Sequence, residues 1–279
     1  MTKYIGITGS VGKSTTIGIL SVLLRNRGFS VHEVHKQDEI KVGLEKADVD
    51  FVLIKFSPFV LENFKDLSLD ISAILNIRTE LKDKDISESN FVKLFGQIYN
   101  NTKEFCIFNA RDRSTDRLVQ DADVVEGARA IGFTRSTPSR GQIGLVEGIV
   151  VDRAFYDDPT DPLRFLNATE ILNLKDYKNL LNAVDVLPDY LVENVVAAIT
   201  IARSLGVSVE SISGSLHQFI LNNTQNHLAY RRDLSVEPQY LSGAVNYVND
   251  LNSQNPVSTL EVLKSYRKNS VILVPPNLH

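Results

Sequence analysis

Residues 9–14, Gly-Ser-Val-Gly-Lys-Ser, have the residue types of a phosphate-binding loop. Glycines let the backbone bend so that consecutive N–H groups point at phosphate oxygens, and the start of a helix adds partial positive charge. In such a loop Lys13 would reach the β- and γ-phosphates of a nucleotide, and the Ser14 hydroxyl would ligate Mg²⁺. The pattern therefore predicts nucleotide binding by Gly9, Ser10, Gly12, Lys13, Ser14 and Thr15.

The spacing of the glycines differs from that of the commonest phosphate loop. That loop has four residues between its two glycines, whereas only Ser10 and Val11 separate Gly9 from Gly12. A chance glycine turn before a helix is the alternative explanation. We favour the phosphate loop because an apolar run precedes it, a helical pattern follows it, and Gly-Lys-Ser-Thr-Thr at 12–16 joins the two.

The segments around the loop indicate an α/β domain. Apolar residues at 17, 20, 23 and 24 predict a helix that ends at Gly28. A parallel sheet with both faces covered is predicted by short apolar runs that alternate with polar or helical stretches, at 4–8, 51–56, 71–77 and 105–109. Glycine-punctuated segments at 129–174 predict a small antiparallel insert attached to this sheet.

A domain boundary is predicted in the polar run at 222–226. Two helices precede it, at 190–205 and about 208–221. After it the pattern predicts a strand, a helix and a strand, at 244–248, 256–266 and 270–274. This single βαβ unit is too small to bury both faces of its own strands. The predicted fold class is thus α/β: a P-loop parallel sheet flanked by helices, with a small antiparallel insert, followed by a truncated Rossmann-like βαβ unit.

Composition excludes several classes of partner. The 279 residues carry a formal net charge of −4, which offers no global attraction for nucleic acid or anionic membranes. No apolar run approaches the ~18 residues of a membrane helix. The single cysteine, Cys106, cannot form an intrachain disulfide. We therefore predict a cytoplasmic protein with no nucleic-acid or membrane partner.

Two families share the short form of the loop. Residues 11–16 resemble the partition-type ATPases, but those proteins carry a second lysine near the start of the loop, where this chain has Thr8. Residues 8–14, Thr-Gly-Ser-Val-Gly-Lys-Ser, fit fully the pattern Thr-Gly-(Thr/Ser)-x-Gly-Lys-(Thr/Ser) of the Mur ligase family.

Later segments follow the Mur ligase order over nearly the whole chain. Ile-Leu-Asn-Ile at 74–77 and Phe-Asn-Ala-Arg-Asp at 108–112 resemble two strand ends of that family. Asn194 opens an alanine-rich helix that ends in Leu-Gly, as in the family's Asn-x-x-Ala-Ala helix. Tyr-Arg-Arg-Asp at 230–233 and Asn-Asp at 249–250 resemble the entry and first strand of its last domain. The chain is most similar to the members that add D-glutamate.

The resemblance implies an ATP- and Mg²⁺-dependent ligase that joins a carboxylate to an amine through an acyl phosphate. It gives Lys13 and Ser14 their phosphate and magnesium roles, places Asn194 near the adenine, and has Arg231 and Asp250 contact the nucleotide from the last domain. Residues 1–226 would be the central ATP-binding domain, and 227–279 a partial C-terminal ligase domain. We expect no N-terminal domain for a uridine nucleotide sugar.

Four positions depart from the family pattern. The family has a magnesium-binding glutamate, a histidine ligand, a lysine that becomes carbamylated and a further lysine. This chain has Lys55, Leu81 with Lys82, Phe95 (with Lys93 nearby) and Asn252 in those places. A lysine in place of a carboxylate ligand opposes a metal ion by charge as well as by geometry. The second metal centre is therefore predicted to be lost.

Three hypotheses for function follow. The first is a Mur-ligase-like ATP-binding protein that is degenerate or incomplete alone. The second is an active amide ligase completed by a partner subunit or by a second copy of the chain. The third is an ATP-switched interaction protein without catalysis. The missing ligands favour the first and third, whereas Lys13, Ser14, Asn194 and Asp250 keep the second open.

Overall fold

A computed structural model describes residues 1–45, 48–64, 67–82, 85–155, 167–177, 189–216, 237–242 and 245–249. The described residues form a sheet of nine strands in the order β2-β3-β1-β4-β5-β6-β7-β8-β9. The strands are β1 (Lys3–Thr8), β2 (Val31–Val34), β3 (Phe51–Lys55), β4 (Ile71–Ile74), β5 (Phe105–Asn109), β6 (Arg129–Phe133), β7 (Gln142–Val146), β8 (Ile149–Asp152) and β9 (Thr169–Asn173).

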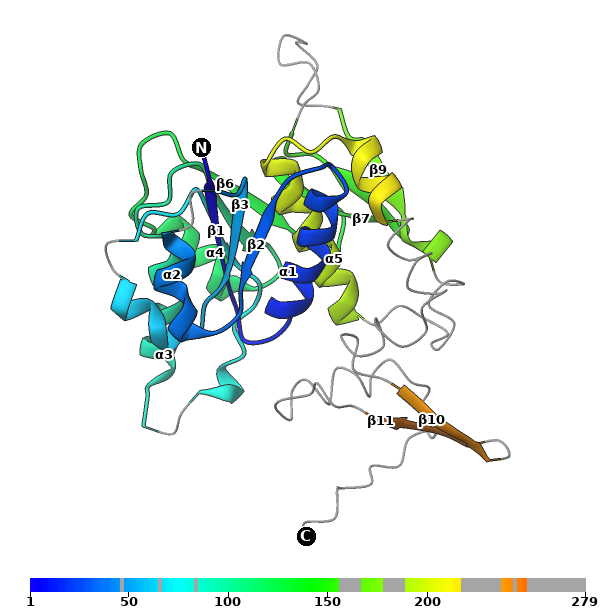
Figure 1. The fold of residues 1–279 in the computed structure, drawn as a ribbon, viewed down its shortest axis with the longest axis horizontal. Helices are drawn as coiled ribbons and strands as arrows, with labels where there is room; N and C mark the ends of the chain where they lie inside the picture. Colours follow the sequence, from blue (N-terminus) through cyan, green and yellow to red (C-terminus); the bar gives the residue numbers. More distant parts are fainter. Residues whose placement is uncertain are drawn as a thin grey trace.

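Helices cover both faces of this sheet, as the continuous apolar strands predicted (Figure 1). One face packs against α1 (Lys13–Arg25) and α5 (Asp189–Ser204). The other packs against α2 (Ile40–Leu44), α3 (Glu88–Gly96) and α4 (Arg113–Gln120). Short 3-10 helices connect these elements: η1 (Gln37–Glu39), η2 (Pro58–Phe64), η3 (Thr79–Leu81), η4 (Gln97–Tyr99) and η5 (Leu174–Tyr177).

The strand order reverses direction at β1. The chain runs from β1 to β2 and β3 on one side, and then crosses to β4 and β5 on the other. All of these strands are parallel to their neighbours. In open α/β sheets, ligands bind outside the carboxyl ends of the strands at such a reversal of strand order. The loop at residues 9–14 lies at this point.

Helix α1 is held by its apolar stripe. The residues that predicted it, Ile17, Leu20, Leu23 and Leu24, are fully buried against the sheet. Burial of side chains of this size contributes about 1.5–3 kcal/mol each. The helix ends at Arg25, and Gly28 beyond it takes the left-handed conformation, with φ 84°. The predicted helix is confirmed and begins at Lys13, directly after the loop.

The antiparallel part of the sheet is confirmed, but it begins later than the sequence suggested. Strand β6 pairs in parallel with β5, so it extends the main sheet. Strand β7 pairs in parallel with β6, and only the β7–β8 and β8–β9 pairs are antiparallel. Alternating apolar residues and glycine turns mark strands and reversals, but they do not say in which direction a strand meets a distant neighbour.

A buried ion pair fastens the antiparallel strands to α5. The Arg203 Nε donates to Asp152 Oδ2 at 2.8 Å, and the two side chains are 8% and 0% exposed. The other oxygen of Asp152 accepts from the backbone N–H groups of Ala154 and Phe155, at 2.8 and 3.0 Å. Arg203 also donates through Nη1 to the Val207 carbonyl at 3.0 Å. Both charges are therefore compensated by hydrogen bonds, as buried ions require.

The end of the chain is described only as a strand pair. The predicted strand at 244–248 is confirmed as β11 (Val245–Asn249), which pairs antiparallel with β10 (Glu237–Ser242), a strand that the sequence analysis did not predict. The helix predicted after 208 is helical at 209–216. The boundary at 222–226, the elements at 256–266 and 270–274, and Arg231, Asp250 and Asn252 lie outside the described residues. The domain division at 226 stays a prediction.

Within the described ranges, no helix combines the length and apolar character needed to cross a membrane.

Candidate nucleotide-binding site

The loop after β1 ends directly in the N-terminus of α1. Gly9 and Gly12 both have positive φ, 150° and 89°, and Gly12 is the N-cap of the helix. A glycine cap has no side chain to accept from the first backbone N–H groups, and the first turn contains no acidic residue. The amides at the start of a helix carry partial positive charge. This end of α1 is therefore suited to bind an anion.

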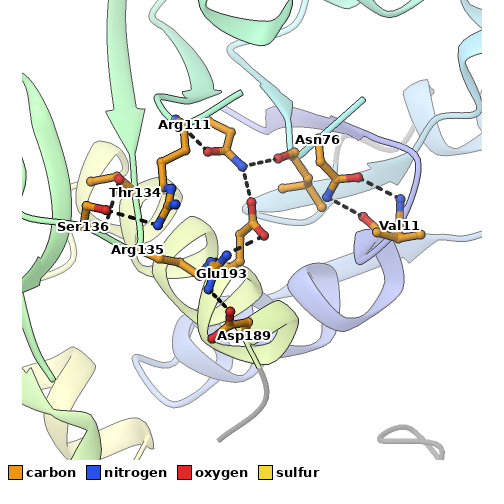
Figure 2. A network of polar contacts seen from close by, with 10 residues as sticks. Val11, Asn76, Arg111, Thr134, Arg135, Ser136, Asp189 and Glu193 are labelled. Atoms are coloured by element: carbon orange, nitrogen blue, oxygen red, sulfur yellow. Dashed lines mark hydrogen bonds and ion pairs between the residues drawn. The ribbon is translucent and has the colours of Figure 1, made fainter. Parts of the chain in front are cut away.

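Asn76, two residues beyond β4, holds the loop from the neighbouring strand. Its Oδ1 accepts from Val11 N at 3.0 Å, and its Nδ2 donates to the Val11 carbonyl at 3.1 Å (Figure 2). Its backbone carbonyl accepts from Ser10 N at 3.0 Å. The Ser10 hydroxyl accepts from the Arg78 backbone N–H at 2.8 Å. These bonds engage the amides of Ser10 and Val11 within the protein. The amides of the first turn of α1 are therefore the candidates for binding an anion.

Sequence reasoning assigned Asn76 to a family motif but gave it no role. The signal was its place, because a polar residue just beyond a buried strand lies at the same sheet edge as the loop. Ser10 was predicted as a binding residue. In the structure its amide and its hydroxyl form hydrogen bonds that hold the shape of the loop.

Lys13 is turned back onto the loop. Its ammonium donates to the carbonyls of Gly9 and Ser10, the latter at 3.4 Å. Burial, and to a smaller extent repulsion from the ammonium of Lys55, together lower the pKa of Lys13 from 10.5 to about 8. A charged lysine held only by neutral carbonyls is poorly compensated. An anion in the loop would supply the missing counter-charge.

Asn194 of α5 packs against the loop at Gly12. A Cβ added to Gly12 would lie 2.2 Å from Asn194 Oδ1. Asn194 is 3% exposed, and its Nδ2 is buried with no hydrogen-bond partner. The structure places Asn194 against the N-cap of α1, and its contact with the adenine, which the resemblance implies, stays a prediction. Its size and position explain why the loop has glycine there.

A second polar network joins the next strand ends to the start of α5 (Figure 2). Asn109, the last residue of β5, donates to the Leu75 carbonyl at 3.0 Å and to Glu193 of α5. Arg135, after β6, forms ion pairs with Asp189 and with Glu193, the latter at 4.0 Å. The network holds α5, and with it Asn194, at the carboxyl edge of the sheet.

Asp112 lies at the same edge of the sheet, between the end of β5 and the start of α4. One carboxylate oxygen accepts from Ser114 N at 3.0 Å and caps α4, while the other accepts from Ile77 N at 2.8 Å. Residues 108–112, which resembled a family segment, therefore bind the segment that follows β4. The strand ends are fixed to one another by side chains.

Two of the positions that depart from the family pattern, Lys55 and Phe95, lie on opposite faces of the sheet. Lys55 ends β3 beside the loop and pairs in register with Ile7 of β1. Phe95 is fully buried in the apolar cluster of the opposite face, where its ring meets that of Phe91 edge to face at 5.2 Å. Lys93 is exposed on α3. The structure thus brings Lys55, and not Phe95, into the candidate site.

No protein-family model matches the chain. A UDP-N-acetylmuramoylalanine--D-glutamate ligase from Streptomyces coelicolor is 31% identical over 268 residues, which cover 94% of this chain and 52% of that ligase. The enzyme of the same name from Bifidobacterium longum subsp. infantis is 26% identical and covers 99% of this chain and 56% of that protein. The chain belongs to the Mur ligase family. It spans about half the length of the curated Mur ligases it matches.

Solved Mur ligases share the fold of this chain. MurF from Acinetobacter baumannii superimposes with a TM-score of 0.64 at 18% identity, over 95% of this chain and 54% of that one. MurF from Thermotoga maritima, whose structure is a complex with ADP, superimposes with a TM-score of 0.56 at 14% identity, over 95% and 56%. At these identities the similarity shows the Mur ligase fold.

Proposed function

We propose that this Mur ligase chain binds ATP at residues 9–15 and provides the ATP-binding part of a ligase that joins a carboxylate to an amine. The observation that carries the proposal is the uncapped N-terminus of α1, with the Lys13 ammonium buried against the loop beside it. The names of the relatives support the reaction class, and the ADP complex of a neighbour in fold supports the nucleotide.

The reaction requires the site to position phosphates and to neutralise their charge. A carboxylate oxygen attacks the γ-phosphorus of ATP, the bond to the β-phosphate oxygen breaks, and ADP leaves. The amine then attacks the acyl carbon, phosphate departs and the nitrogen loses a proton. In phosphoryl transfer the protein works almost entirely by positioning and charge stabilisation. Lys13 and the first-turn amides of α1, including that of Thr15, would hold the β- and γ-phosphate oxygens.

The residues present fit one magnesium ion. Ser14 lies exposed in the first turn of α1, where its hydroxyl is open to a ligand. When bound there, Mg²⁺ would neutralise phosphate charge. Asn194 would keep the N-cap in place, and Arg231 and Asp250 would contact the nucleotide from residues 227–279. A second magnesium ion at Lys55 does not fit, because an ammonium cannot ligate a cation.

Lys13→Ala is expected to weaken ATP binding by on the order of 10- to 100-fold, because a hydrogen bond to a charged group contributes about 1.5–3 kcal/mol. Isothermal titration of the purified chain with Mg²⁺-ATP measures the change. Lys41→Ala, which removes an exposed lysine on α2, is the matched control and should bind as the wild type does. Equal affinity of the Lys13 variant and the wild type would refute the assignment of the loop.

ATP affinity is expected to fall with pH above about 8. In the free protein Lys13 loses its proton near this pH, but phosphates stabilise its charged form and raise its pKa on binding. Binding above about pH 8 must therefore take up a proton, and affinity should drop by up to about tenfold per pH unit. Titrations between about pH 7 and 9.5 measure this slope. Lys13→Arg, which stays charged, should give a nearly flat profile; a flat wild-type profile would contradict the proposal.

A phosphate-release assay separates the active ligase from the other two hypotheses. The chain is mixed with ATP, candidate carboxylates and candidate amino acids, with and without proteins encoded nearby. Release that requires both substrates supports a working ligase. ATP binding without release supports a degenerate or nucleotide-switched protein.

A further inference from the structure

A second lysine lies at the phosphate end of the candidate site. Lys55 is the last residue of β3 and pairs with Ile7, two residues before Gly9. The pairing continues past it, because Phe56 N donates to the Ile7 carbonyl at 2.9 Å and Thr8 Oγ1 donates to the Phe56 carbonyl at 3.1 Å. Lys55 is therefore fixed to the strand from which the loop begins.

The side chain of Lys55 belongs to the face that carries α1. Side chains alternate along a strand, and Phe51 and Leu53, which share the parity of Lys55, pack in the same apolar cluster as α1. Helix α1 starts at the carboxyl edge of β1, beside the end of β3. The Lys55 ammonium and the start of α1 are thus on the same face and at the same edge of the sheet.

Among the residues that the structure describes, neither Lys13 nor Lys55, the two cations at this edge, forms an ion pair. Lys55 is half-buried, and none of the acidic side chains that the structure describes forms an ion pair with it. Lys13 donates to carbonyl groups. The two ammonium groups share one face and one edge of the sheet, where like charges repel each other. Like charges held together in this way favour an anion between them.

We propose that Lys55 is a second phosphate-binding cation, which contacts the phosphate chain of ATP directly and supplies there the positive charge that a carboxylate-bound metal ion would otherwise bring. This rests on the proposed binding of ATP at residues 9–15. A carboxylate at this position reaches a phosphate only through a metal ion, whereas an ammonium donates to the phosphate oxygens itself. In this proposal Lys55 replaces the charge of the metal ion, so the loss of the metal ligand does not mean the loss of phosphate binding.

Lys55→Gln tests the assignment with two readouts that move in opposite directions. Removing one of two repelling charges should raise the melting temperature of the ligand-free protein. The same change should weaken ATP binding by about tenfold, because a charged hydrogen bond to phosphate is lost. A residue with only a structural role would lower both. Lys55→Arg, which keeps the charge, should retain most of the affinity, and Lys41→Gln on α2 should change neither readout.

Lys55→Glu tests the exchange of cation for metal. Removing Mg²⁺ with EDTA should lower the ATP affinity of the wild type less than it lowers the ATP affinity of the glutamate variant. In that variant the carboxylate repels the phosphates unless a metal ion bridges them. Titration of both proteins with ATP in EDTA and in excess Mg²⁺ gives the comparison. A larger magnesium dependence in the variant supports the proposal, and an equal dependence overturns it.

The outcomes separate this inference from the proposed function. If Lys13→Ala loses ATP while Lys55→Gln and Lys55→Glu both bind it as the wild type does, Lys55 has no phosphate contact and the proposed function stands. If Lys13→Ala also binds ATP normally, the proposed function itself fails. Should Lys55→Gln not fold, Lys55→Arg and Lys55→Met take its place, and equal affinity of these two variants overturns the inference.

Discussion

Asp152→Ala is expected to destabilise the fold by about 3–5 kcal/mol, the typical cost of leaving a buried charge without its partner. The Asp152 side chain is fully buried and accepts from Arg203 at 2.8 Å and from two backbone amides. Without this carboxylate, the Nε of Arg203, whose side chain is 8% exposed, and the backbone amides of Ala154 and Phe155 lose their acceptor. The melting temperature should fall by roughly 10 °C or more.

Urea unfolding followed by circular dichroism measures this loss. Glu104→Gln is the matched control, because Glu104 pairs with Lys3 at 2.7 Å on side chains that are 34% and 39% exposed, and exposed pairs contribute under about 1 kcal/mol. A paired replacement, Asp152→Leu with Arg203→Met, should recover much of the stability, because apolar residues can replace a buried ion pair. A cost for Asp152→Ala as small as that of the control would contradict the expectation.

Gly12→Ala is expected to destabilise the chain by about 2–5 kcal/mol and to remove ATP binding. Two costs combine: a non-glycine residue at φ 89° pays about 1–2 kcal/mol, and forcing a methyl group into packed space pays about 1–3 kcal/mol. The new Cβ would lie 2.2 Å from Asn194 Oδ1. Asn194 is 3% exposed and held on α5, so the N-cap of α1 must move. The amides that would bind phosphate then lose their alignment.

Thermal unfolding and ATP titration of four variants, Gly12→Ala, Asn194→Ala, the double variant and the control Gly18→Ala, separate the two costs. Gly18→Ala, on the same helix with nothing within 4 Å of its added Cβ, should be neutral or stabilise by up to about 1 kcal/mol. Adding Asn194→Ala to Gly12→Ala removes the clash but not the backbone strain. The double variant should therefore be more stable than the sum of the single changes implies. Strict additivity would show that Asn194 does not restrict Gly12.

Local sequence determined the elements of this protein and the character of its loop. The helix after the loop follows from apolar residues at 17, 20, 23 and 24, and the strands at β1, β3, β4 and β5 follow from continuous apolar runs. Each signal lies within a few residues of the element it specifies, because helical and strand periodicities are local properties of the backbone. The residue type of Gly9 and Gly12 likewise indicates a loop whose backbone adopts positive φ, because glycine does so without steric cost.

The tertiary structure decided what these elements meet. The parallel pairing of β6 with β5, the hydrogen bonds of Asn76 to the loop and the contact of Asn194 with Gly12 all join residues far apart in the chain. The sequence alone indicated that Lys55 replaces a metal ligand of the family. The register of β3 on β1 shows in addition that it lies at the same sheet edge as Lys13. Sheet order and register arise from the summed packing of many distant residues, so only the folded chain reveals which charges share one edge.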